Sequence, residues 1–271
     1  MKKLILNILF LLCVIGVSAQ QSGVQPAFRD GEQLTLKVSY RAKLIPNTEV
    51  ATVVMSVADT TINGHPYYCI YANARTMPSW RWFYNLNDTY RSYIDTTTFR
   101  PVLSTSQIRE NGYRAWSKFE YDWDKGVSIN HKQRRQDPVR EWQIPIAGKS
   151  YDGVSLFYDL RTTDSATLVE DQDRTIALLL NDTVRYINYR FLGRESKRVR
   201  GVGTFRTLKF SCQLATSTGE SFEDGSEFFI WISDDRNKIP IFFESPIRVG
   251  SVRAYINSFD GLRFPLECLE E

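Results

Sequence analysis

Alternation of apolar and polar residues runs through most of this chain and predicts β-strands. Residues 34–40 alternate strictly, and 50–57 and 67–72 continue the pattern on either side of an Asn63-Gly64 turn. These three segments are expected to form a meander. Further strands are predicted at 89–94, 102–108, 114–123, 127–133, 175–180, 184–191, 199–216, 227–233, 239–244 and 250–257.

Two segments depart from the strand pattern. Residues 152–161 form the one predicted helix, because Asp152 can cap its first N–H groups and large apolar residues recur at helical spacing. Arg161 would then lie at the negative end of the helix dipole. Residues 77–85 crowd several aromatic side chains together, which favours a short helix or an ordered loop over a strand.

The densest apolar run after the first twenty residues is 227–233, whose two faces both carry large side chains. We expect this strand to be covered on both sides. Pro240 places the following strand at a sheet edge or at a bulge. The pattern as a whole predicts a mainly β protein with one short central helix. Residues 20–271 would form one domain, or two packed β lobes that meet near 150–165.

The N-terminal residues 1–19 have the features of a signal peptide: a basic start, an apolar run over 4–17 and a small-x-small site that ends at Ala19. The run is shorter than the roughly 20 apolar residues that span a bilayer. We therefore expect a periplasmic or secreted protein that keeps no transmembrane segment after cleavage. Cys13 has no small residue beside it, which disfavours a lipid anchor.

Charge and composition narrow the list of partners. The whole chain has 34 Lys and Arg against 31 Asp and Glu, and the leader accounts for two of the lysines, so the mature chain is almost neutral. Export disfavours a nucleic-acid partner. Two local strips, 132–140 and 185–209, are strongly basic and could meet anionic glycans, lipid head groups or cell-wall polymers, although a solvated, Arg-rich hairpin is the favoured interpretation.

Three cysteines follow the leader: Cys69, Cys212 and Cys268. An odd number leaves at least one thiol unpaired within the chain. Cys212 and Cys268 fall on apolar strand faces, which favours buried small side chains. A Cys212–Cys268 disulfide is the alternative in an oxidising compartment.

Catalytic and metal-binding patterns are weak. The two histidines, His65 and His131, have no ligand or triad partner at suitable spacing, so we expect no metal site and no cofactor. Asp234 and Asp235 form the most visible carboxylate pair, which indicates either a charged turn or the acid and base of a hydrolase. An enzyme is therefore the less favoured interpretation, and its catalytic residues are unknown.

Candidate ligand-binding residues are aromatic side chains, which can stack on sugars or line an apolar groove, and two arginines of the basic strip. They are Trp80, Trp82, Tyr84, Trp116, Trp142, Arg194 and Arg198. Packing within a wide β core is the alternative role of the aromatic residues.

Five spaced motifs together resemble the DUF3108 family of exported bacterial proteins, whose function is unknown. They are Gly31-Glu32-x-Leu34, Asp88-x-Tyr90-x-Ser92-Tyr93-x-Asp95, Tyr151-Asp152-x-x-Ser155-Leu156-x-Tyr158-x-Leu160-Arg161, Trp231-x-Ser233-Asp234-Asp235-x-Asn237-x-x-Pro240 and Ile247-x-Val249-Gly250-Ser251-Val252. The resemblance implies strongly curved antiparallel sheets, similar to the half-barrels of lipoprotein carriers and other periplasmic ligand binders. It implies no catalytic residue.

The leader also resembles those of Bacteroidetes. Four Asp-Thr or Asp-Ser patterns are similar to the O-glycosylation acceptors of that phylum, with candidate attachment at Thr60, Thr96, Ser165 and Thr183. Ordinary turns between strands are the alternative explanation.

The leading functional hypothesis is an exported, non-enzymatic binding protein that holds an apolar or amphipathic envelope molecule on a curved sheet. Three alternatives stay open: a glycan or cell-wall binding module, a hydrolase with dispersed carboxylates, and a structural partner in an envelope complex. The sequence leaves the oligomeric state undetermined.

Overall fold

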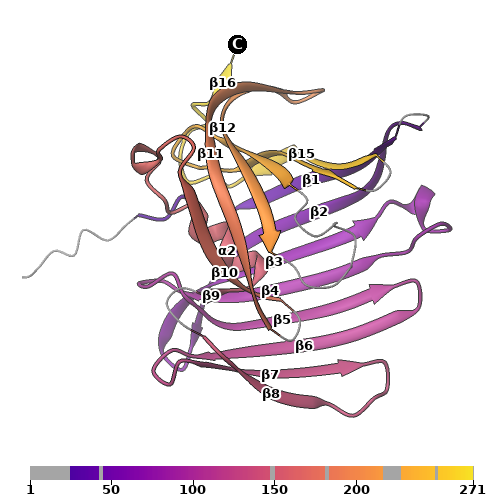
Figure 1. Ribbon diagram of the computed structural model, residues 1–271, viewed down its shortest axis with the longest axis vertical. Coiled ribbons are helices and arrows are strands. Elements are labelled where there is room, and N and C mark those ends of the chain that lie inside the picture. The colour runs from indigo at the N-terminus through magenta and orange to yellow at the C-terminus, as the bar shows by residue number, and fades with distance from the viewer. Residues whose placement is uncertain are drawn as a thin grey trace, which may run out of the picture.

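The structure, a computed structural model, describes residues 25–42, 45–146, 150–180, 183–215, 227–247 and 250–270. The predicted signal peptide and its cleavage site lie outside these residues. The described chain forms one sheet of sixteen strands (Figure 1). The mainly β, curved antiparallel architecture with one short central helix that the sequence predicts is confirmed.

The strands are β1 (Gln33–Ala42), β2 (Ile45–Ile62), β3 (His65–Thr76), β4 (Asn87–Asp95), β5 (Pro101–Glu110), β6 (Tyr113–Asp122), β7 (Val127–Arg134), β8 (Arg140–Pro145), β9 (Ser150–Tyr151), β10 (Asp173–Leu180), β11 (Thr183–Val199), β12 (Gly203–Ala215), β13 (Glu227–Ser233), β14 (Pro240–Pro246), β15 (Ser251–Asp260) and β16 (Leu269–Glu270). The helical elements are α2 (Gly153–Leu160) and the short 3-10 turns η1 (Pro78–Trp80) and η2 (Ser165–Thr167).

Neighbours in the chain are neighbours in the sheet, whose order is β8-β7-β6-β5-β4-β3-β2-β1-β15-β14-β13-β12-β11-β10-β9. The pairing of β1 with β15 joins the first half of the chain to the second half in one continuous ladder. Strands β9 and β10 pair in parallel, and the other named strand pairs are antiparallel. Strand β16 adds to β12 beside this path.

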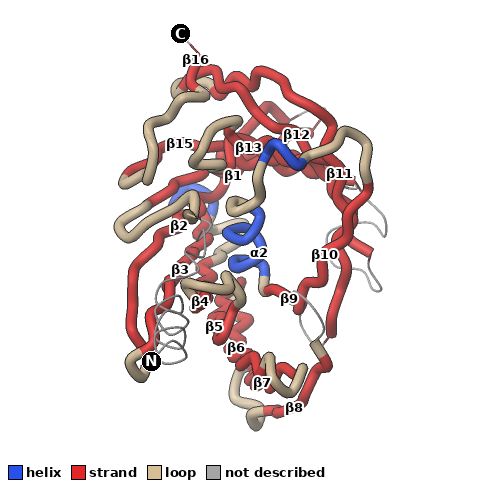
Figure 2. The backbone as a smooth tube through the Cα atoms, turned by 90° about the vertical axis from the view of Figure 1, so that its left-hand side faces the viewer, coloured by secondary structure: helices blue, strands red, loops and turns tan. Residues whose placement is uncertain are grey.

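The sheet curls around α2, which lies inside the curve (Figure 2). Tyr121 of β6 and Leu179 of β10 belong to one apolar cluster together with Ile146, although their strands lie far apart in the sheet order. Contact between such distant strands requires strong curvature, which follows from the natural twist of a long antiparallel sheet. The curl gives the protein a concave interior with the helix inside it.

Helix α2 begins and ends where its sequence predicts. The Asp152 side chain accepts hydrogen bonds from the backbone N–H groups of Val154 and Ser155, and Ser155 completes a capping box. The Ser92 hydroxyl donates to the same carboxylate at 2.7 Å and so ties the helix to β4. The buried face of α2 includes Val154 and Tyr158, which pack against the sheet.

Several boundaries differ from the sequence prediction. Strand β11 extends beyond 184–191 to Val199, because a register shift between Phe191 and Arg194 lets pairing with β12 resume. Strand β8 was not predicted, since its short polar sequence lacks clear alternation. The ladder shifts register where Pro240 pairs with Ile232, so the bulge interpretation of this proline is confirmed.

Candidate ligand-binding pocket

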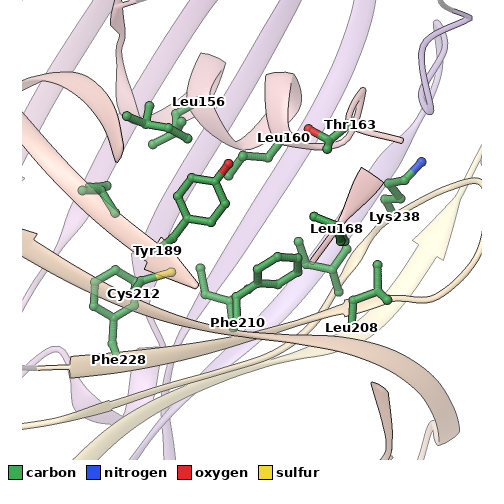
Figure 3. A pocket seen from close by; sticks show the side chains of 14 residues that line it. Leu156, Leu160, Thr163, Leu168, Tyr189, Leu208, Phe210, Cys212, Phe228 and Lys238 are labelled. Atoms are coloured by element: carbon green, nitrogen blue, oxygen red, sulfur yellow. The ribbon is translucent and has the colours of Figure 1, made fainter. Parts of the chain in front are cut away.

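An apolar cavity of about 90 Å³ lies between α2 and the strands β10 to β13 (Figure 3). Its lining is aliphatic and aromatic apart from three side chains that carry oxygen or nitrogen. The lining residues are Leu156, Leu160, Thr163, Leu168, Ile176, Ile187, Tyr189, Leu208, Phe210, Cys212, Phe228, Ile230, Ile232 and Lys238.

Strand periodicity builds the larger wall of this cavity. On β12 and β13 the lining residues occupy every second position, so their side chains point to the same face of the sheet. Register then places them directly opposite one another. The cross-strand pairs are Leu208 with Ile232, Phe210 with Ile230 and Cys212 with Phe228.

The helix and its following loop build the other wall. Leu156 and Leu160 lie four residues apart on α2, so they share one helical face and both point at the strands (Figure 3). Because the capping box fixes the start of α2, the position of this apolar face is fixed as well. Leu168, beyond the 3-10 turn η2, adds to the lining from the loop that leads to β10.

Lys238 gives the cavity a charged rim. Its aliphatic stem lines the cavity, while its amino group points away from the apolar residues (Figure 3). Burial lowers the pKa of Lys238, and the charges of Asp164 and Asp235 oppose this effect. A half-buried cation at the edge of an apolar space suits the polar end of an amphiphile.

The cavity lining carries few chemically reactive groups. Its thiol, Cys212, is buried, and this burial raises its pKa to about 12, so it stays protonated at neutral pH and is a poor nucleophile. Among the described residues no three His, Cys, Asp or Glu side chains are grouped as metal ligands would be. Nothing in the lining provides an acid and base pair.

The seven residues expected to bind ligand lie outside this cavity. Trp80, Trp82 and Tyr84 lie in and after η1, Trp116 on β6, Trp142 on β8, and Arg194 and Arg198 on β11. The structure brings only the first three together. Arg194 binds Asp234 at 3.0 Å, and Trp142 packs against Phe119.

Two patterns in the sequence fall on residues that line the cavity. The apolar alternation of 208–212 and the run 227–233 both point to it, yet alternation alone does not tell a filled core from a cavity. The expectation that 227–233 is covered on both sides holds for Trp231, which is buried on the outer face beneath the amino group of Lys197 at 3.5 Å from the ring centroid.

The visible carboxylate pair belongs to a turn. Asp235 accepts hydrogen bonds from the Ser233 hydroxyl and the Asn237 N–H, and Asp234 binds Arg194. A different carboxylate has a raised pKa: burial, the largest effect, raises the pKa of Asp88 to about 6, although the Arg109 N–H donates to it. Asp88 lies on β4, outside the cavity lining, and sequence reasoning missed it.

The three cysteines following the leader are free thiols. Cys212 belongs to the apolar cluster of β11 to β13, whereas Cys268 belongs to a separate cluster with Phe205 and Ile239. The structure therefore does not form the Cys212–Cys268 bond that the sequence left open as the alternative. Each thiol occupies the place of a small apolar side chain, which was the other interpretation.

The four candidate acceptor hydroxyls lie at strand ends and turns. Thr60 is near the end of β2, Thr96 is in the turn after β4, Ser165 begins η2 and Thr183 begins β11. Asp164 caps η2 by accepting from the Ala166 N–H, so at this site the acidic residue also has a turn function.

A curved antiparallel sheet wrapped around one helix, with an apolar cavity beneath that helix, defines a barrel-like β protein. The chain belongs to the DUF3108 family, described as a protein of unknown function, which matches residues 35–257. No curated protein matches the sequence. The described residues contain no helix with the length and apolar character needed to cross a membrane.

Comparison with solved structures gives two matches of different strength. One is the β-barrel-like protein of the domain of unknown function DUF1849 from Brucella abortus, with a TM-score of 0.56, 8% identity, and coverage of 86% of this chain and 98% of that one. The other is a putative lipoprotein from Parabacteroides distasonis, with a TM-score of 0.34, 12% identity, and coverage of 88% and 98%. The first similarity supports the barrel-like fold and nothing more specific.

Proposed function

We propose that this protein is an exported, non-enzymatic binding protein that holds an apolar or amphipathic ligand in the cavity beneath α2. The observation that carries this proposal is the continuous apolar lining from α2, β11, β12 and β13. The leader at 1–19 supports export to a compartment where envelope lipids are the abundant amphiphiles.

The size of the cavity indicates the shape of the ligand. An engineered apolar cavity of about 150 Å³ stays dry and binds benzene. A volume of about 90 Å³ is smaller and suits a slender hydrocarbon segment better than a ring. Each methylene buried there would contribute about 0.8 kcal/mol, so a short acyl segment gives useful affinity without any hydrogen bond.

The charged rim at Lys238 would orient the ligand in the cavity. The hydrocarbon end would enter between Leu160 and Phe210, and the polar end would stay near Lys238 and Thr163 at the boundary. An amphiphile meets both requirements, because its apolar part is removed from water while its head group remains accessible.

The two other ligand or reaction classes have less support. Trp82 is strongly exposed, but its ring meets Phe83 edge-on at 69° and does not form a flat platform for a sugar. Asp88 has the raised pKa that a hydrolase needs, yet it accepts a backbone hydrogen bond that joins β4 to β5 and lies outside the cavity lining.

Binding of the neutral straight-chain alcohol dodecanol, measured by isothermal titration calorimetry, tests the proposal. We expect saturable binding to the chain produced from Gln20 and at least about tenfold weaker binding to Ile187→Phe, because the added volume fills the cavity. Val139→Phe, at an exposed position between β7 and β8, is the matched control and should bind as the native chain does. Equal binding by a folded Ile187→Phe protein would refute the assignment.

Solvent extraction provides a second test that needs no variant. Purified protein is extracted and the extract is analysed by mass spectrometry for amphiphiles present in proportion to the protein. If the extract contains no amphiphile and the protein does not bind dodecanol, the result would count against a ligand-holding function.

A further inference from the structure

Trp82 and Phe83 form an aromatic tip at one end of the sheet. Their side chains are 80% and 71% exposed, the highest values among the exposed large apolar side chains of the described residues. Their ring centroids lie 5.9 Å apart in an edge-on arrangement. Exposure of two adjacent large aromatic residues is costly in water and typically marks an interaction site.

The loop that carries the aromatic tip is held in place. The backbone N–H of Phe83 donates to the Trp80 carbonyl at 3.0 Å. The Asn85 N–H donates to the Asn111 side chain at 2.8 Å, and the Asn111 N–H donates back to the Asn85 carbonyl at 2.9 Å. These bonds fix the tip against the turn between β5 and β6, so its exposure is a built feature of the fold.

Four exposed arginines lie on the strands and turns beside the tip: Arg109, Arg114, Arg134 and Arg135, which we call the arginine rim. Arg109 and Arg114 are directly opposite each other on β5 and β6, an arrangement of like charges that costs stability. The Arg135 N–H donates to the Arg114 carbonyl at 2.7 Å, which brings the β7–β8 turn into the same row. Figure 1 shows these turns on one side of the molecule.

The arginine rim has few partners within the protein. None of its members takes part in the ion pairs found among the described residues. Of the carboxylates on the same segments, Glu110 accepts a hydrogen bond from a tyrosine of the tip loop, and Asp88 is buried. Over residues 109–114 and 132–141 the sequence has six Lys and Arg against three Asp and Glu, so positive charge is in excess.

We propose that the aromatic tip and the arginine rim form a docking surface for an anionic phospholipid bilayer. Tryptophan and phenylalanine favour the boundary between head groups and acyl chains, and arginine pairs with phosphate. Two aromatic side chains bury about 500 Å² at most, which is less than the roughly 800 Å² that each partner gives to a stable protein interface. The surface is separate from the cavity, so this inference does not depend on the proposed ligand.

Vesicle co-sedimentation at physiological salt tests the docking surface. The chain is produced from Gln20, which retains every described element and removes the apolar leader that would itself insert into lipid. We expect binding to vesicles of equal parts phosphatidylglycerol and phosphatidylcholine, and about tenfold weaker binding to pure phosphatidylcholine. Trp82→Ser with Phe83→Ser, and separately Arg134→Ser with Arg135→Ser, should each weaken binding to the anionic vesicles by about tenfold.

Matched changes elsewhere on the surface serve as controls. Tyr186→Ser removes an exposed aromatic side chain from β11, and Arg198→Ser with Arg200→Ser removes two exposed charges near its end. Both controls should bind anionic vesicles as the native chain does. Absence of native binding, retention of binding by folded tip variants, or equal losses in the controls would each overturn the proposal. Crosslinking of position 82 to another protein without vesicle binding would assign the surface to a protein partner instead.

Discussion

Arg161 and Glu32 form a fully buried ion pair that links two parts of the chain 129 residues apart. The two guanidinium nitrogens donate to the two carboxylate oxygens at 2.5 and 2.8 Å, and both side chains are 0% exposed. The same guanidinium donates to the Asn237 carbonyl at 3.1 and 3.0 Å. Three segments that carry the family motifs therefore meet at one buried cation, whose function is structural.

Removal of one partner of this pair should be strongly destabilising. Arg161→Met leaves the Glu32 carboxylate buried without its cation, which typically costs 3–5 kcal/mol, roughly. The double variant Arg161→Met with Glu32→Leu removes both charges and should recover part of that loss. The free energy of unfolding in urea measures both effects.

The exposed pair Arg190–Asp173 is the control for this experiment. Its two ends are solvated, so Arg190→Met should change the free energy of unfolding only slightly. A loss of similar size at Arg161 would show that the buried pair is not a principal support of the fold.

Asp88 should make stability depend on pH between about 4 and 6. Burial raises its pKa from 3.8 to about 6, so the folded protein binds this proton more tightly than the unfolded chain. Its contribution to stability is present below about pH 4 and is lost as the pH rises through about 6; the difference amounts to about 3 kcal/mol. Asp88→Asn should remove this component, with the largest gain over the native chain at pH 7.

Urea unfolding of the native chain and Asp88→Asn at pH 4 and pH 7 gives the comparison. The difference between the two proteins should be much smaller at pH 4, because Asp88 is protonated in the folded state and, with an ordinary pKa of 3.8, is partly protonated in the unfolded chain. A difference that is independent of pH would show that the carboxylate does not titrate in this window.

Lys238 should distinguish charged from neutral amphiphiles. Lys238→Met keeps the aliphatic stem and removes the charge, so binding of dodecanoate should weaken by about fivefold while binding of dodecanol changes little. Because burial lowers the pKa of Lys238, the preference for dodecanoate should fade at a pH below 10.5. Calorimetric titration of each ligand, repeated across the pH range, measures these effects, with Lys125→Met at an exposed ion pair as the control.

Thiol labelling should separate the three cysteines. Cys69 is half-buried and should react with a maleimide first, because burial raises the pKa of Cys212 to about 12 and holds that of Cys268 well above its usual range. A bound amphiphile should slow Cys212 further, since this residue lines the cavity. In urea without reductant all three should react; a single reactive thiol would establish a disulfide.

Intact mass of protein isolated from its natural source tests the four acceptor patterns. Modification at any of Thr60, Thr96, Ser165 or Thr183 should add the mass of a glycan, and peptide mapping would locate it. An unmodified mass for material isolated from the envelope would rule out this modification.

Local patterns predicted the elements of this fold well. Alternating and continuous apolar patterns located β1 to β7 and β10 to β15, and Asp152 located the start of α2, because strand period and helix capping depend on residues close in sequence. The bulge at Pro240 followed from its missing N–H. The resemblance in five motifs identified the family that residues 35–257 match.

The candidate site was harder to predict from the sequence. Its residues follow ordinary strand and helix patterns, and they come from segments that are far apart in the chain. No feature of the sequence distinguishes Leu208 and Ile232 from core residues. The cavity between these strands and Leu156 of α2 arises from strand register and from the position of the helix. The tryptophans that the sequence analysis selected as ligand-binding candidates lie outside the cavity. Trp82 lies on an exposed loop and Trp142 packs on the sheet, because aromatic content does not specify which face or which end a side chain occupies.

The sequence by itself determined the leader pattern, the strands, the helix cap and the family, since each depends on neighbouring residues or on ordered motifs. The tertiary structure alone decided that the sheet curls around α2 and leaves an apolar cavity. It also decided that Arg161, at the C-terminal end of α2 as the sequence predicts, is buried against Glu32. Such outcomes depend on sheet twist and on contacts between residues far apart in the chain, which short-range patterns do not encode.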